Sequence, residues 1–187
     1  MQLNKAIQNR KSVRKYSPKK PDWRKIIEAI DAARYAPMAG NNFSLKFILV
    51  DDQEKIQKIT KACQQDFMEK AQYLVVACSN NSRLVNAYGK RGERYSRQQA
   101  GAAIQNFLLK IEEAKLSTCW IGHFVDSQIK KVLDISKETD IEAIFPIGHE
   151  YEKAKTRKRK ADLDNFLYFN EYGNKQMKSP RVVNENA

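Results

Sequence analysis

The sequence is poor in the residues on which disulfide-stabilised, metal-binding and membrane-spanning proteins depend. Its 187 residues include three cysteines, two histidines, seven glycines and five prolines. The cysteines Cys63, Cys78 and Cys119 form no Cys-x-x-Cys pair, so we expect buried free thiols and no metal site. No apolar run approaches the length of a membrane helix, and the first residues lack the apolar core of a secretory signal. We therefore expect a cytoplasmic protein that does not enter a membrane.

Signatures of the common nucleotide-binding and catalytic sites are also missing. The chain has no G-x-G-x-x-G fingerprint, no P-loop, no G-x-S-x-G elbow and no H-E-x-x-H motif. Its only histidines, His123 and His149, have no cluster of acids beside them, so catalysis by protein acids, bases or a metal is poorly supported. If the chain is an enzyme, a bound cofactor is expected to carry the chemistry.

Positive charge, by contrast, is abundant and unevenly distributed. The formal net charge is +12, and residues 1–25 contain nine Lys or Arg against one acid, Asp22. Residues 153–160 contain six Lys or Arg and no acid. Such a balance suits a nucleic acid, an anionic membrane face or a phosphorylated small molecule, and it also suits a plain solvated surface. Charge alone leaves these alternatives open.

Hydrophobic periodicity predicts helices that separate a few short strands. Helices are expected at residues 3–10, 21–33, 53–68 and 97–115 and after an N-cap at Asp126, and strands at 46–50, 73–78 and 141–148. The stretch 80–97 follows neither period and is expected to be an excursion with short helical pieces. These elements predict a single domain over residues 1–187, of the α+β or three-layer α/β class, with a loose tail at 175–187.

Three segments have the composition to meet an anionic, flat ligand. Arg10-Lys11-Ser12-Val13-Arg14 carries three cations and a hydroxyl, and in an extended chain its alternate residues share one face. Arg157-Lys158-Arg159-Lys160 adds four cations. Ala36-Pro37-Met38-Ala39-Gly40-Asn41 offers small residues where backbone can approach a flat ligand closely. Taken singly, each segment is more simply explained as a solvated turn or loop.

Taken in order, these segments resemble the nitroreductase family of FMN-dependent oxidoreductases over about residues 3–173. The first resembles the family's Arg-Arg-Ser-x-Arg-x-Phe opening, and the loop resembles its Ala-Pro-Ser-x-x-Asn motif. Gln99 to Leu109 is similar to the family's central helix, and Thr118 to Gly122 is similar to its Gly-Leu-Gly-Thr-x-Trp-Ile-Gly segment. Ala143 to Gly148 is similar to the Ile-x-Pro-Ile-Gly segment, and Arg157 to Arg159 is similar to the closing basic pair. Each piece is common by itself, whereas six in the right order are not.

The resemblance implies a nitroreductase-like three-layer α/β/α sandwich with a central, mainly antiparallel sheet. It also implies an interlocked homodimer with two FMN sites at the interface. Arg14 would lie near the N1–C2 edge of the flavin, where a cation favours the anionic reduced form. The ribityl phosphate would be held by Arg10, Lys11, Ser12, Arg157 and Arg159. The ring or ribityl chain would meet Gln64 or Gln65, backbone of Trp120, Ile121 and Gly122, and, from the partner subunit, Pro37, Met38, Ala39 and Asn41.

Some positions depart from the family pattern. Phe43 and Leu45 stand where the family often has Gln-x-Trp, and Met38 replaces a serine that would donate near the ring. Tyr16 stands where the opening motif has Phe. These differences bear on the acceptor and on the redox tuning of the flavin more than on FMN binding.

The implied activity is a ping-pong reaction. NADH or NADPH would reduce the FMN and leave, and a small flat acceptor such as a nitroaromatic or quinone would then take two electrons. Tyr88, Arg91 and Tyr95, within the excursion 80–97, are predicted to contact the acceptor or the nicotinamide, and no side chain is expected to be catalytic by itself.

Other activities remain open. The same fold also supports dehalogenation, flavin fragmentation and azoline oxidation, and a flavin-binding protein without turnover is a further alternative. A basic nucleic-acid-binding module would explain the charge but not the ordered apolar motifs, so no nucleic-acid partner is expected.

Overall fold

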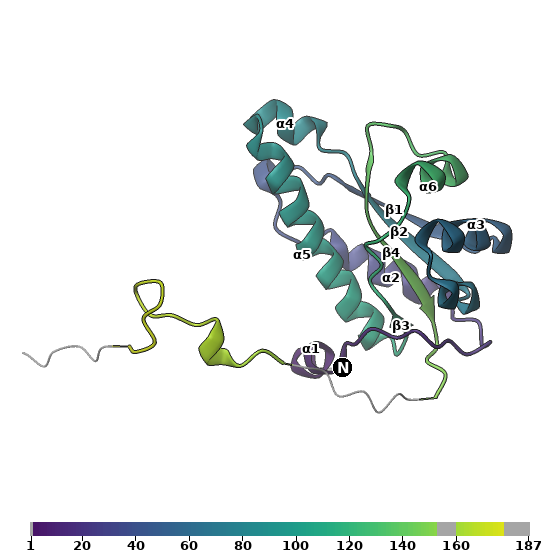
Figure 1. The fold of residues 1–187 in the computed structure, drawn as a ribbon, viewed down its shortest axis with the longest axis horizontal. Coiled ribbons are helices and arrows are strands. Elements are labelled where there is room, and N and C mark those ends of the chain that lie inside the picture. Colours follow the sequence, from purple (N-terminus) through teal and green to yellow (C-terminus); the bar gives the residue numbers. More distant parts are fainter. Residues whose placement is uncertain (1, 153–159, 178–187) are drawn as a thin grey trace, which may run out of the picture. The chain divides into compact units, whose positions relative to one another are not determined.

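The computed structural model describes residues 2–152 and 160–177. Its contacts form two compact units, Met1–Lys153 and Ala154–Ala187. The first unit holds every strand and α-helix of the described residues (Figure 1). Its elements are α1 (Leu3–Asn9), α2 (Trp23–Ala33), η1 (Ala39–Asn41), β1 (Leu45–Val50), α3 (Gln53–Cys63), η2 (Asp66–Lys70), β2 (Tyr73–Ser79), α4 (Ser82–Tyr88), α5 (Arg91–Glu113), β3 (Ser117–Thr118), α6 (Asp126–Leu133) and β4 (Asp140–Gly148).

The centre of this unit is a four-stranded sheet with the order β1-β2-β4-β3. Every neighbouring pair is antiparallel, with Val75 of β2 opposite Leu49 of β1 on one side and Phe145 of β4 on the other. All residues of β2 are buried, which explains its continuous apolar sequence. The expected central antiparallel sheet is confirmed.

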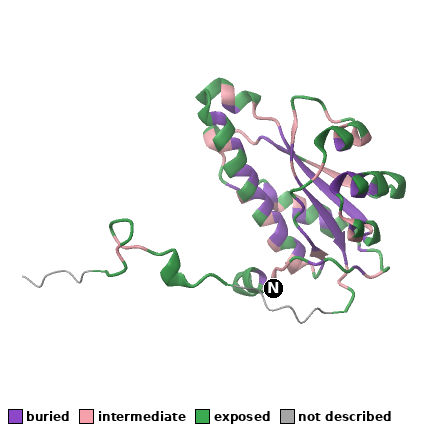
Figure 2. Cartoon of the chain, in the orientation of Figure 1, coloured by how far each residue is buried: buried purple, intermediate pink, exposed green. Residues whose placement is uncertain are grey.

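Side chains of β2 point alternately to two hydrophobic clusters, one on each face of the sheet. Val75 and Ala77 pack with residues of α2 and α5, such as Ile26 and Phe107. The opposite cluster contains the next residues along the strand, together with residues of α3 and α6: Leu74, Val76, Cys78, Ile56, Ile59 and Ile129. Figure 2 shows the buried strands between two layers of helices that are exposed on their outer sides. The three-layer arrangement is therefore confirmed.

The three cysteines all belong to the second cluster. Each thiol is free and buried, as expected. Burial raises the pKa of Cys63 to about 12, and burial followed by the Glu142 carboxylate raises the pKa of Cys78 to about 11. Both thiols therefore stay protonated at neutral pH.

The third helix is shorter than its sequence suggests. Asp52 caps its start by accepting a hydrogen bond from Lys55 N at 3.0 Å. The helix ends at Cys63 because Gln64 adopts a left-handed conformation with φ +55°, and a short 3-10 turn follows. The predicted end at residue 68 was therefore wrong.

The long helix α5 begins at Arg91, six residues before the predicted start. Its first turns bury Gly92, Ser96 and Gln99, which are small or polar, so no apolar periodicity marks them. A Cβ on Gly92 would lie 2.3 Å from Leu84 O, so α4 crosses the start of α5 at backbone contact. The prediction of short helical pieces is confirmed for α4 alone.

The start of α6 also differs from the prediction. Val125 is the N-cap and makes no side-chain cap hydrogen bond, whereas Asp126 is the first helical residue. A carboxylate in the first turn still favours the helix through its macrodipole, which is why the sequence resembled a cap.

The described part of the second unit is a set of turns. A 3-10 turn, η3 (Leu163–Asn165), is followed by a loop in which Asn174 Nδ2 donates to Phe169 O at 2.8 Å. The rings of Tyr168 and Tyr172 lie 4.8 Å apart. The predicted phosphate ligands Arg157 and Arg159 and most of the predicted tail, 175–187, lie outside the described residues. No helix in residues 2–152 and 160–177 combines the length and apolarity needed to cross a bilayer.

Candidate functional site

The basic segment 10–16 runs beside β3 at the edge of the sheet and is attached by two isolated bridges. Ser12 forms a parallel bridge with Thr118 of β3, and Val13 N donates to Thr118 O at 2.9 Å. Tyr16 forms an antiparallel bridge with Glu150, just beyond β4. The backbone of this segment is therefore held at both ends by the sheet.

Tyr16 is the buried anchor of the segment. Its hydroxyl lies 2.7 Å from Val13 O and 3.2 Å from Pro146 O, and burial raises the pKa of Tyr16 far above its ordinary value. The hydroxyl therefore remains a neutral donor to backbone carbonyls, which explains why a tyrosine can replace the phenylalanine of the family pattern. The ring packs against Gly148, where a Cβ would come within 2.8 Å of it.

The polar residues of the segment are exposed or half-buried, with alternation holding over residues 12–14. Val13 and Tyr16 are buried, whereas Ser12 and Arg14 are exposed and Arg10 is half-buried at the C-cap of α1. Ser12 and Arg14 flank the buried Val13 and are both exposed. These side chains can offer a hydroxyl and guanidinium groups to one anion.

Lys11 differs from its neighbours because it already has a carboxylate partner. Its Nζ lies 2.8 Å from Glu150 Oε1, and both side chains are partly shielded. Glu112 of α5 lies in the same cluster: burial raises its pKa first, and the charges of Lys11 and Arg10 lower it in part. The carboxylates offset part of the positive charge that the sequence suggests is available here.

The segment Trp120–Gly122 lies directly beside the basic segment, because Thr118 links the two. Ile121 pairs with Ile144 of β4 through two backbone hydrogen bonds of 3.0 Å, which leaves the adjacent Trp120 and Gly122 exposed. The Trp120 ring is 42% exposed and packs edge-on against Phe145 at 5.6 Å. Two of the predicted cofactor-binding segments are therefore brought together within one chain.

Arg14 reaches a third predicted segment, the one around Gln64 and Gln65. Its guanidinium carbon lies 6.0 Å from the centre of the Phe67 ring, and Phe67 follows shortly after the two glutamines, of which Gln64 is exposed and Gln65 half-buried. An open cavity of about 780 Å³ adjoins this contact. Its lining residues are Arg14, Lys15, Tyr16, Pro18, Asp66, Phe67, Lys70, Gln72 and Tyr151. Sequence reasoning missed Phe67, since an isolated aromatic in a polar stretch carries no pattern.

The loop 37–41 is a tight turn with two left-handed residues. Gly40 has φ +56° and Asn41 has φ +54°, and Asn42 N donates to Ala39 O at 3.1 Å. Pro37, Met38 and Ala39 line a cavity of about 290 Å³ together with Tyr95, Gln98, Gln99 and Ala102 of α5. The turn therefore presents a small, mainly apolar surface against the first half of α5.

The predicted substrate residues Tyr88 and Tyr95 lie at this same loop. Their rings form an edge-to-face pair with centres 5.4 Å apart, and a Cβ on Gly40 would lie 2.6 Å from the Tyr88 hydroxyl. Arg91 is exposed in the first turn of α5, one turn before Tyr95. The structure thus gathers the loop and the three residues at one end of α5.

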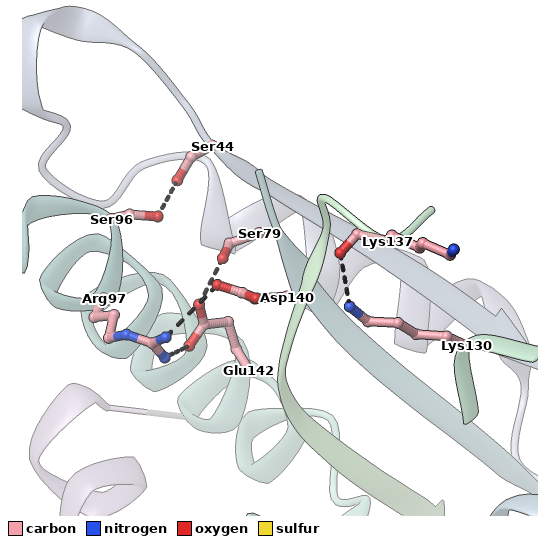
Figure 3. Close-up of polar contacts among 8 residues, drawn as sticks. All are labelled: Ser44, Ser79, Ser96, Arg97, Lys130, Lys137, Asp140 and Glu142. Carbon is pink, nitrogen blue, oxygen red and sulfur yellow. Dashed lines mark hydrogen bonds and ion pairs between the residues drawn. The ribbon is translucent and has the colours of Figure 1, made fainter. Parts of the chain in front are cut away.

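A buried polar network lies next to the loop 37–41, and the sequence did not predict it. Gln99 Oε1 accepts from Ser44 N at 2.8 Å and from the Ser44 hydroxyl at 2.7 Å, and Gln99 Nε2 donates to Asn42 O at 3.1 Å. Ser44 also lies 3.2 Å from the Ser96 hydroxyl (Figure 3). The departures at Phe43 and Leu45 have a structural reason, because both side chains pack on the core.

A second polar cluster lies near Gly122, where the central strand β2 ends and β4 begins. Ser79 donates to Glu142 Oε1 at 2.5 Å, and Arg97 lies 3.5 Å from Glu142 and 3.6 Å from Asp140 (Figure 3). Gly122 joins these charged residues in lining a polar pocket of about 310 Å³. Arg97 faces two carboxylates, so the cluster keeps a net negative charge.

Within one chain, the basic segment and the loop lie at opposite ends of α5. Glu112 interacts electrostatically with Arg10 and Lys11 near the end of the helix, whereas Tyr95 lines the loop cavity near its start (Figure 1). A helix rises about 1.5 Å per residue, which separates Tyr95 from Glu112 by about 25 Å. The structure does not bring these two halves of the predicted site together.

Two relatives and two solved structures show what this chain is similar to. A Methanocaldococcus jannaschii protein with a nitroreductase name is 29% identical over 104 residues, 56% of this chain and 52% of the relative, so the chain spans about half of that relative. The iodotyrosine deiodinase of Thermotoga neapolitana is 22% identical over 163 residues, 79% of this chain and 88% of that enzyme.

Among solved structures, a nitroreductase family protein from Clostridium novyi NT aligns with a TM-score of 0.74 and 25% identity over 93% of this chain and 96% of its own. The FMN-dependent nitroreductase of Clostridium difficile R20291 has the same fold, with a TM-score of 0.75 and 23% identity over 89% and 98% of the two chains. The sequence model of the nitroreductase family matches residues 7–149, which include the basic segment, the loop and all four strands. The chain belongs to the nitroreductase family.

Proposed function

We propose that two copies of this chain form a homodimer that binds FMN between the basic segment of one copy and the loop 37–41 of the other. In this state the protein passes two electrons from NADH or NADPH to a small flat acceptor. The observation that carries the proposal is the separation of about 25 Å along α5, which no single chain can close. Similarity in fold to an FMN-dependent nitroreductase supports the choice of cofactor.

The basic segment fits the phosphate end of FMN by its donors. Guanidinium groups bind phosphate oxygens through paired, charge-assisted hydrogen bonds, and a serine hydroxyl adds a further donor. Arg10 and Ser12 lie on a backbone that the sheet already holds, so little ordering is needed on binding. Arg157 and Arg159 would complete this end of the site.

The loop fits the ring end by its shape. Left-handed residues let the backbone turn sharply, and Pro37, Met38 and Ala39 carry no charge that a flat ring would have to desolvate. Trp120, Ile121 and Gly122 would meet the ring through the backbone beside the basic segment, and Gln64 or Gln65 would do so near Arg14. When bound, FMN supplies the two-electron chemistry that the side chains of this chain lack.

The work left to the protein is positioning, charge stabilisation and exclusion of water. Arg14 would stabilise negative charge at the edge of the ring through its guanidinium. The neutral Tyr16 holds the backbone next to Arg14 and adds no competing charge. Tyr95 and Arg91 would contact the acceptor or the nicotinamide.

Colour is the direct test of this function. The purified protein should be yellow or take up FMN, and its absorbance should bleach without oxygen when NADH or NADPH is added. A colourless protein that FMN cannot reconstitute contradicts the proposal and favours a basic nucleic-acid-binding module. A yellow protein that never bleaches indicates a flavin-binding protein without turnover.

Mixed dimers test whether the site is shared. When Arg10→Ala and Asn41→Ala chains carry different tags, tandem purification isolates the dimer that contains one of each. If the two halves come from different chains, this dimer has one doubly altered site and one intact site, so it binds one FMN tightly. If both halves come from one chain, neither site is intact and the mixed dimer binds no better than its parents.

Reductive dehalogenation is the second candidate, because a relative that covers most of this chain is an iodotyrosine deiodinase. Turnover of a nitroaromatic and of a halogenated tyrosine under the same reducing conditions separates the two. Turnover of the halogenated tyrosine alone would assign the chain to dehalogenation.

A further inference from the structure

We propose that Tyr88 is a positioning residue that holds the loop 37–41 in its ligand-facing conformation, and that it does not itself contact the acceptor. The inference rests on the proposed FMN site. It revises the role of Tyr88 that the sequence suggests, and it assigns this residue to the loop-bearing half of the site.

Contact between Tyr88 and Gly40 is the first support. A Cβ built on Gly40 would lie 2.6 Å from Tyr88 Oη and 3.5 Å from Cε2 and Cζ, so the end of the tyrosine side chain already occupies the space beside this glycine. Gly40 is also left-handed, with φ +56°. The turn therefore favours glycine for two separate reasons, its backbone and its neighbour.

The second support is the way Tyr88 itself is held. Its ring packs edge-on against Tyr95 at 5.4 Å, and Tyr95 lines the loop cavity with Pro37, Met38 and Ala39. Tyr88 is the last residue of α4, whose backbone touches α5 at Gly92. A chain of contacts thus runs from α5 through the two tyrosines to the turn.

This arrangement makes the loop and the start of α5 a single unit. A flat ligand that meets Met38 and Ala39 meets a surface whose position depends on Tyr88, 49 residues after Ala39 in the chain. Phe at position 88 keeps the ring contacts, whereas Ala removes both the cover over Gly40 and the partner of Tyr95. The contribution of Tyr88 therefore comes from its ring.

FMN affinity of the apoprotein, measured by quenching of flavin fluorescence, tests the proposal. Tyr88→Ala should weaken binding about tenfold, the scale of the aromatic pair that it removes, while Tyr88→Phe should bind as the wild type does. The KM for the acceptor and kcat should change together in Tyr88→Ala. A higher KM with unchanged kcat and unchanged FMN affinity would show direct acceptor contact and overturn the proposal.

A double-mutant comparison at Gly40 and Tyr88 tests the contact between these two residues. Gly40→Ala brings a methyl group against the Tyr88 hydroxyl, and removing that oxygen in Gly40→Ala/Tyr88→Phe leaves only ordinary ring contacts and the left-handed backbone cost. The double variant should therefore be more stable to urea than Gly40→Ala alone. Equal stability of the two would contradict the contact, even if the protein bound no FMN at all.

Mixed dimers assign Tyr88 to one half of the site. A dimer of Tyr88→Ala with Arg10→Ala should regain one tight FMN site, because the defects fall in different halves. A dimer of Tyr88→Ala with Asn41→Ala should regain none. A tight FMN site in the second dimer but not in the first would place Tyr88 with the basic segment. No tight FMN site in either dimer, while the wild type is yellow, would leave Tyr88 with a general role in stability. Either result overturns the proposal.

Discussion

The basic segment 10–16 and the loop 37–41 are held by different physical means. The basic segment lies in register with β3, so backbone hydrogen bonds and the buried Tyr16 determine its path, and its cations project outward. The loop pairs with no strand; a left-handed turn, ring packing and the Gln99 network determine its shape.

The difference matters because the two halves would meet different ends of one ligand. A phosphate is recognised by charge and by several donors, which tolerate small shifts of exposed side chains. A flat ring is recognised by surface shape, which requires a rigid backbone. Variants of the exposed cations of the first half should therefore change affinity with little loss of stability, whereas variants of the buried anchors of either half should change stability as well.

The largest effect is expected at the helix crossing behind the loop. Gly92→Ala places a Cβ 2.3 Å from Leu84 O, so α4 must move away from α5, at a cost of about 3 kcal/mol. Urea unfolding measures this loss. Gly101→Ala on the same helix is the control: nothing lies within 4 Å of its Cβ, so the variant should gain roughly 1 kcal/mol. Equal stability of the two variants would contradict the close crossing.

The next largest effect concerns the two cations beside the sheet edge. Arg10→Ala should weaken FMN binding by about 1.5–3 kcal/mol, the range for a hydrogen bond to a charged group. Lys11→Met should cost less, because the Glu150 carboxylate already neutralises Lys11. Both losses should shrink in high salt. A larger loss for Lys11→Met would show that the ion pair opens when the ligand binds.

Removal of the Tyr16 hydroxyl comes third. Tyr16→Phe leaves the buried carbonyls of Val13 and Pro146 without this donor, and the free energy of unfolding should fall by about 1–2 kcal/mol. Tyr35→Phe, at a 70% exposed ring, should stay within about 0.5 kcal/mol of the wild type. Similar losses in both variants would mean that the hydroxyl does not anchor the segment.

The smallest effect is a pH dependence at His149, whose carbonyl accepts from Ser17 N beyond the basic segment. Burial first, and then the charge of Lys19, hold the pKa of His149 below its ordinary value. The unfolded chain therefore binds a proton more readily than the folded chain, so stability is full above about pH 6.5 and declines as the pH falls below it. His149→Gln should flatten this decline in urea titrations at pH 5 to 7. An unchanged slope would assign the decline to other groups.

Much of the fold was predictable because its elements carry their own patterns. The apolar run of β2, the helical spacing of α2 and the order of the family motifs all survive in the structure. The first turns of α5 were missed because Gly92, Ser96 and Gln99 are selected for close approach and hydrogen bonding, which leave no hydrophobic period.

Within the candidate site, residue types were predictable and their relationships were not. The alternation of Val13 with Ser12 and Arg14 follows from strand geometry and needs no tertiary information. The pairing of Lys11 with Glu150, 139 residues away, and the contact of Arg14 with Phe67 depend on how distant segments meet.

By itself, the sequence predicted the family through the order of its motifs, and the family resemblance implied the antiparallel core; charge and motif position also nominated the residues proposed to meet a phosphate and a ring. Only the tertiary structure decided that the two sets lie at opposite ends of α5, and that one is anchored by Tyr16 and the other covered by Tyr88. The physical reason is that a long helix converts a short stretch of sequence into a large separation in space, while side-chain packing joins residues that the sequence keeps apart.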